Sequence, residues 1–122
     1  MGIQTVKNRE AISKIAKREQ FRNHNRTLEG KKFFPISHIA RCGRMVLSRY
    51  NIDFVDFELA RMKANNALIP FYVVFSYQTP IAWSIEGSAL HVCHENYSAT
   101  TAKHKALVRE ADPMHVQIKE GH

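Results

Sequence analysis

The sequence predicts an α+β fold: a small antiparallel β-meander packed by a C-terminal helix and preceded by a basic N-terminal helical arm. Two apolar patterns support this fold. Residues 72–94 alternate short β-branched and aromatic runs with turn residues, and residues 100–111 carry an apolar stripe at helical spacing. The third observation is charge, because residues 1–50 hold twelve Lys and Arg against three Glu. We therefore expect a basic arm over residues 1–32 and a single α+β domain over residues 33–122.

Length and composition agree with one globular domain. The chain has 122 residues, of which 44% are hydrophobic and 24% charged, and its net charge is +7. Two cysteines allow at most one disulfide, which is too few for a secreted scaffold of this length, so we expect a cytoplasmic protein. The apolar run over residues 67–75 is interrupted by Pro70 and is too short to cross a bilayer, so no membrane partner is expected.

The first element expected is a helix over residues 6–22, a stretch of good helix formers without Gly or Pro. Its apolar stripe is narrow and consists of Ala11, Ile12, Ile15 and Ala16. Because the rest of this helix is charged, it would pack weakly and become ordered only against a partner. This reasoning is what predicts an arm.

Residues 33–50 decide neither helix nor strand, and we favour irregular structure with short strands there. Residues 53–63 place acidic side chains first and basic ones last, which agrees with the helix dipole and predicts a short amphipathic helix ending at Asn65-Asn66.

Three strands of the meander follow, over residues 72–77, 81–85 and 89–94. Residues 78–80 supply the first turn, and Glu86-Gly87 supplies the second.

The last helix is expected from residue 100 to residue 111, where Asp112-Pro113 stops it. Its buried stripe would comprise His104, Leu107, Val108 and Ala111, whereas water would surround Lys103, Lys105, Arg109 and Glu110. We interpret His104 as a buried histidine whose ring is bonded to a neighbouring hydroxyl. The alternation over residues 114–118 fits either an edge strand or a frayed terminus.

Two stretches of this region, Tyr72 to Trp83 and Tyr97 to His104, resemble a small domain found in uncharacterised proteins of actinobacterial phages and of those bacteria. The resemblance implies a phage-type accessory protein of the host cytoplasm, in a family with no established enzymatic activity. The shared residues look structural, because Pro80 sets a turn and Trp83 fills a core.

The basic segment is the strongest functional signal. Clustered cations neutralise backbone phosphates, and nearby aromatic rings can stack on exposed bases. The candidate phosphate-binding residues are Lys7, Arg9, Lys14, Lys17, Arg18, Arg22, Arg26, Lys31, Lys32, Arg41, Arg44 and Arg49, and the candidate stacking residues are Phe21, His24, Phe33 and Phe34. The competing interpretation is a solvated helix with no partner.

No metal, cofactor or catalytic site is predicted. The spacing of His38, Cys42, His91 and Cys93 is too loose for a typical zinc site. A base and nucleophile could be drawn from His104 with Ser98, Tyr97 or Glu95, but no strained elbow or glycine-rich oxyanion loop accompanies them. The acids Asp53, Asp56 and Glu58 are explained by the helix dipole.

Two functions from different classes follow. The first is a non-enzymatic accessory protein that binds DNA or RNA through backbone phosphates. The alternative is a phage-encoded inhibitor that docks on the acidic face of a host or defence protein, such as one that handles nucleic acid.

Overall fold

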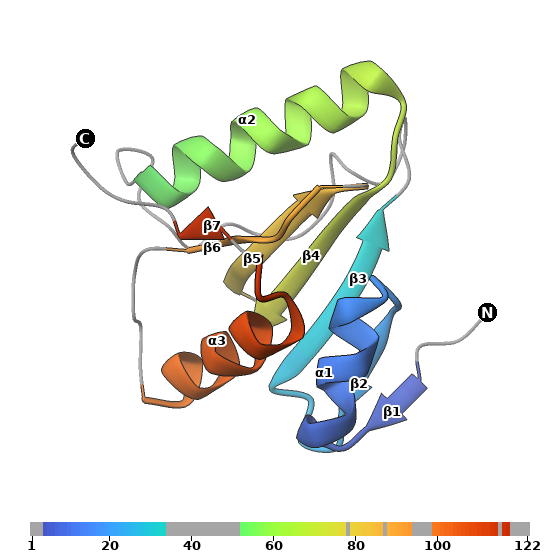
Figure 1. Ribbon diagram of the computed structural model, residues 1–122, viewed down its shortest axis with the longest axis vertical. Helices are drawn as coiled ribbons and strands as arrows, with labels where there is room; N and C mark the ends of the chain where they lie inside the picture. The colour runs from blue at the N-terminus through green and yellow to red at the C-terminus, as the bar shows by residue number, and fades with distance from the viewer. Residues whose placement is uncertain are drawn as a thin grey trace.

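The computed structural model describes residues 4–33, 52–77, 79–86, 88–93, 99–114 and 116–117. It confirms the α+β class: the described residues form one seven-stranded sheet and three helices (Figure 1). The strands are β1 (Gln4–Val6), β2 (Phe21–Asn23), β3 (Leu28–Phe33), β4 (Phe71–Ser76), β5 (Thr79–Ile85), β6 (His91–Val92) and β7 (Val116–Gln117). The helices are α1 (Asn8–Ala16), α2 (Ile52–Ala67) and α3 (Ala99–Ala111).

The strands lie side by side in the order in which they occur along the chain. Strands β2 to β6 pair antiparallel, whereas β1 pairs parallel with β2 and β7 pairs parallel with β6. A parallel neighbour needs a crossover connection, and the chain makes these connections through α1 and α3. The sheet is therefore an antiparallel meander extended at each edge by a short parallel strand.

Helix α2 covers one face of the sheet, and helices α1 and α3 cover the other. Successive side chains of a strand point to opposite faces, and in β4 Phe71 packs against Phe57 of α2 while Tyr72 donates a hydrogen bond to the Glu19 carbonyl just after α1. Helices α1 and α3 pack against each other on the Tyr72 face (Figure 1). On the α2 face, the Phe57 ring lies edge-on to Phe71 and to Trp83, with ring centroids 5.5 and 5.2 Å apart. Trp83 is fully buried, as predicted.

Residues 4–33 are part of the sheet, so the prediction of a separate arm over residues 1–32 is not confirmed. Strand β3 pairs with β4 over its whole length, from Leu28 opposite Ser76 to Phe33 opposite Phe71. Within this segment the apolar residues Val6, Ala11, Ile15, Phe21 and Leu28 are all buried. The narrow stripe of α1 is sufficient because α3 and the sheet cover it from two sides.

The helix predicted over residues 6–22 is shorter than expected, since α1 ends at Ala16. Arg18 takes a left-handed conformation with φ 56°, and the Arg18 and Glu19 amides donate to the Ile15 and Lys14 carbonyls. This pair of bonds is a Schellman motif, which ends a helix by reversing the chain. It is usually built on glycine, and for this reason the sequence did not reveal it.

Gly30 is required where β3 passes the buried rings of the α1 face. A Cβ atom at this position would overlap the Tyr72 hydroxyl and the Phe21 ring. Any larger residue would therefore push apart the packing between β2, β3 and β4.

The remaining elements confirm most predictions and correct several details. The three strands of the meander and the helix ending at Ala111 form near the expected positions. However, Thr79 and Pro80, predicted as turn residues, begin β5, and the third strand is limited to His91–Val92. Helix α2 runs to Ala67, beyond the predicted end at Asn65-Asn66. Lys105, which was predicted to face water, is buried. The tail forms the edge strand β7. Residues 34–50, predicted to be irregular, lie outside the described residues.

Among the described residues, no helix combines the length and the apolar character needed to cross a bilayer.

Candidate functional site

Five of the predicted phosphate-binding side chains lie near the two ends of α1, and we call this set the cation stripe. None of them forms an ion pair with any residue in the described ranges, and four are exposed while the fifth, Lys32, is half-buried. The cation stripe consists of Lys7, Arg9, Lys17, Arg26 and Lys32.

The fold brings these residues to the two ends of α1. Lys7 follows β1 and Arg26 lies in the turn after β2; these two strands run parallel, with Val6 opposite Asn23, so both cations lie near the start of α1. Arg9 lies in the first turn of α1. Lys17 and Lys32 lie near its end, where both line a small cavity of about 120 Å³.

Four other predicted cations are engaged within the molecule. Arg18 pairs with Asp112 at 3.0 Å and also donates to the Ser84 hydroxyl and the Ser88 carbonyl. The remaining pairs are longer: Arg22 to Glu29 at 3.6 Å, Lys31 to Glu29 at 3.7 Å, and Lys14 to Glu19 at 3.5 Å. Arg41, Arg44 and Arg49 lie outside the described residues.

The predicted stacking residues are poorly placed for bases. Phe21 is fully buried, and Phe33 is half-buried, with its ring centroid 6.3 Å from that of Phe75. His24 is exposed in the turn after β2, whereas Phe34 lies outside the described residues. In the described part of the chain, the cation stripe therefore presents charge with little aromatic surface.

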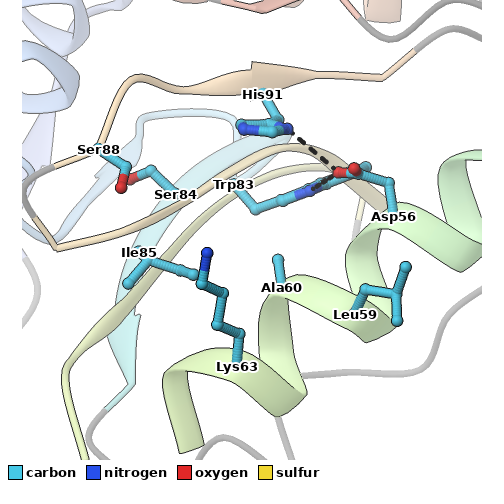
Figure 2. Close-up of a pocket in the computed structure, with 9 residues that line it drawn as sticks. All are labelled: Asp56, Leu59, Ala60, Lys63, Trp83, Ser84, Ile85, Ser88 and His91. Atoms are coloured by element: carbon cyan, nitrogen blue, oxygen red, sulfur yellow. Dashed lines mark hydrogen bonds and ion pairs between the residues drawn. The ribbon is translucent and has the colours of Figure 1, made fainter. Parts of the chain in front are cut away.

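A second cluster lies between α2 and the β5–β6 end of the sheet, beside a cavity of about 230 Å³ (Figure 2). The buried Trp83 indole Nε1 donates to Asp56 Oδ2 at 2.6 Å, and His91 Nδ1 lies 3.3 Å from the same oxygen. The Asp56 carboxylate thus links α2 to two neighbouring strands. Lys63, two turns after Asp56 in α2, extends towards β5 along the wall of this cavity.

Within this cluster, Asp56 and His91 shift each other's pKa. The interaction with Asp56 raises the pKa of His91 above its ordinary value, against the effect of burial. Burial would raise the pKa of Asp56, but the bonds from His91 and Trp83 outweigh burial and lower it. Asp56 and His91 are therefore both charged over a wider pH range than the same two side chains would be when free.

Sequence reasoning missed this cluster. It assigned Asp56 to the helix dipole and His91 to a weak zinc candidate, and it treated Trp83 only as a core residue. One signal was available: the chain has a single Trp, and a buried indole N–H needs an acceptor.

The weaker predicted sites are resolved as follows. His91 pairs with Asp56 and Cys93 is buried, whereas His38 and Cys42 lie outside the described residues. Within the described ranges, no three His, Cys, Asp or Glu side chains gather in a way that could hold a metal ion.

His104 is the buried, bonded histidine that the sequence predicted. Its Nδ1 lies 2.7 Å from the Ser76 hydroxyl of β4, and burial lowers its pKa. The nucleophiles once considered with it, Ser98, Tyr97 and Glu95, lie outside the described residues.

Comparison with known proteins gives a family and no activity. A family model described as a family of unknown function, DUF8033, matches residues 3–116. The chain belongs to the DUF8033 family. The DUF8033 match covers the basic segment and the meander together, in line with their shared sheet. No curated protein and no solved structure gives a significant match.

Proposed function

We propose that this DUF8033 protein is a non-enzymatic accessory factor that binds nucleic acid through backbone phosphates along the cation stripe. The observation that carries the proposal is the uncompensated charge of that stripe. Residues 4–33 hold nine Lys and Arg against three Glu, a net +6, whereas the described residues from 52 onwards hold five against six, a net −1. Unpaired cations gathered on one side attract a polyanion and release its counterions on binding.

The dimensions of the stripe suit a phosphate backbone. Helix α1 has nine residues, so it is about 14 Å long at roughly 1.5 Å per residue. Phosphates of one DNA strand recur about every 3.4 Å along the duplex axis, so about four of them span this length. Two exposed small residues of α1, Ser13 and Ala16, leave room for a backbone between the cations at its two ends.

The contacts available to the stripe predict binding without sequence reading. Lys and Arg side chains on phosphates set position but carry no base information. Phe21, which could have stacked on bases, is buried. We therefore expect similar affinities for unrelated sequences of equal length.

The proposal places this activity in the cytoplasm, and the motif resemblance over residues 72–104 supports a phage-type protein acting in a host cell. A protein partner with an acidic face would use the same cations. Capture of bound molecules from a cell lysate distinguishes a nucleic-acid partner from a protein partner. Nuclease treatment removes the nucleic acid and leaves a protein partner bound.

The test is a binding series against salt with a matched control. With five phosphate contacts, the logarithm of the binding constant should fall with that of salt at a slope of about −4.5. Replacing the stripe residues with Gln (Lys7, Arg9, Lys17, Arg26 and Lys32) should abolish measurable binding. The control Lys63→Gln/Lys103→Gln, which removes two exposed cations elsewhere, should bind almost normally. A flat salt series, or equal losses in both variants, would contradict the proposal.

A further inference from the structure

We propose that the cavity between α2 and β5 binds a small carboxylate with an apolar body. Lys63 and His91 would hold the carboxylate group, and Leu59, Ala60 and Ile85 would contact the rest of the molecule. This cavity differs from the one that Lys17 and Lys32 line, although Ser84 borders both.

Charge selects an anion with a single negative charge. Three ionisable side chains line the cavity, and two of them, Asp56 and His91, face each other, so their charges cancel when His91 is protonated. Lys63 forms no ion pair with any residue that the structure describes. The lining therefore keeps one uncompensated positive charge, which a carboxylate would neutralise.

Hydrogen-bond donors remain available for such a group. Because Nδ1 of His91 is turned to Asp56, the Nε2 edge of the ring is left for a ligand; in Figure 2 that edge lies on the side of Ser84 and Ser88. Ser88 is exposed and its hydroxyl can donate. An imidazolium edge and an ammonium group are charge-assisted donors, which make the stronger bonds to carboxylates.

The apolar wall and the volume limit the rest of the ligand. Leu59 is 61% exposed although it borders the cavity, and Ala60 and Ile85 complete an apolar surface beside the two cations. An apolar cavity of about 150 Å³ holds one benzene molecule. A cavity of about 230 Å³ therefore has room for one ring and a carboxylate, and is small for a nucleotide.

The protein contains its own reporter for this site. Trp83 is the single tryptophan, and its indole N–H is bonded to Asp56 at the cavity wall. Ligand entry should change the indole N–H resonance and the tryptophan fluorescence. The probes are benzoate, its neutral analogue benzamide, and inorganic phosphate.

We expect saturable binding of benzoate, with benzamide and phosphate each at least about tenfold weaker, since neither matches both the charge and the apolar wall. The exposed variant Lys63→Gln should weaken benzoate binding about five- to tenfold and leave benzamide unchanged. The control Lys103→Gln, on the exposed side of α3, should have no effect.

Any of four results would overturn the inference, and the first three concern benzoate. These are the absence of a saturable change up to about 10 mM benzoate, equal affinities for benzoate and benzamide, and an unchanged benzoate affinity in Lys63→Gln. Phosphate binding more tightly than benzoate would also exclude a carboxylate ligand. His91→Gln gives a second variant, in which benzoate affinity should fall while the cation stripe still retains nucleic acid.

Discussion

The two halves of the sheet differ in how much unpaired positive charge they carry. Around β1 to β3 and α1, five cations remain without ion pairs among the described residues. Around β4 to β6, polar groups are turned inward and bonded, as Ser76 is to His104 and Trp83 is to Asp56. One continuous sheet thus has a cation-rich region and a region of bonded polar groups, and we propose a polyanion as the partner of the first and a small carboxylate as the ligand of the cavity beside the second.

Deleting residues 1–32 is the largest test of this comparison. The deletion would remove β1, β2, α1 and nearly all of β3, together with their buried apolar residues, and would expose the edge of β4. We expect no cooperative thermal unfolding and poor dispersion of the amide resonances. If the fragment over residues 33–122 folded well, this result would support the original prediction that residues 1–32 are a separate arm.

Gly30→Ala tests the packing that joins the two halves. The added methyl group meets the Tyr72 hydroxyl and the Phe21 ring, and overpacking of this kind costs about 2 kcal/mol of unfolding free energy. Denaturant unfolding would measure the loss. Tyr72→Phe removes one of the two obstacles, so in a double-mutant cycle it should recover part of the loss; strict additivity would show that the hydroxyl is no obstacle.

Ser76→Ala tests the inward-turned polar network. It leaves His104 Nδ1 buried with its hydroxyl partner removed, which should lower the unfolding free energy by about 1 to 2 kcal/mol. Ser13→Ala, on the exposed side of α1, is the matched control and should change stability by less than about 0.5 kcal/mol. Similar losses in both variants would mean that the bond contributes little.

The smallest expected effect concerns pH. The folded pKa of His91 is raised, so its pairing with Asp56 stabilises the protein fully below the unfolded value of 6.5 and is lost as pH rises through the folded pKa. Since both side chains are partly exposed, we expect less than about 1 kcal/mol. The unfolding free energies of the natural protein and of His91→Gln should therefore converge between about pH 5 and about pH 9. A difference that grew with pH would contradict this assignment.

The sequence predicted features that depend on residues close together in the chain better than features that depend on distant residues. The strands of the meander and the helix from Ala99 to Ala111 depend on local periodicity and turn residues, and they form near the expected positions, with different ends for β5 and β6. The burial of His104 also followed from its place on a helical stripe. Lys105 was predicted on the exposed side of the last helix but is buried, since the covering of that helix depends on contacts that its own periodicity does not show.

The same distinction explains the two sites. The excess of basic residues near the N-terminus is a property of composition, and the sequence alone was enough to find it. Which of these cations stay unpaired depends on contacts such as Arg18 with Asp112, whose positions differ by 94. The Trp83–Asp56 bond joins positions 27 apart on different elements, and no local pattern links them.

By itself, the sequence determined the α+β class, the meander, the last helix and the uneven charge. Only the tertiary structure decided that the basic segment belongs to the sheet and that Arg18 forms an internal ion pair. It also decided that Asp56, Trp83 and His91 lie together. The physical reason is that periodicity tells which face of an element is buried, whereas the partner that covers this face is chosen by packing between distant segments.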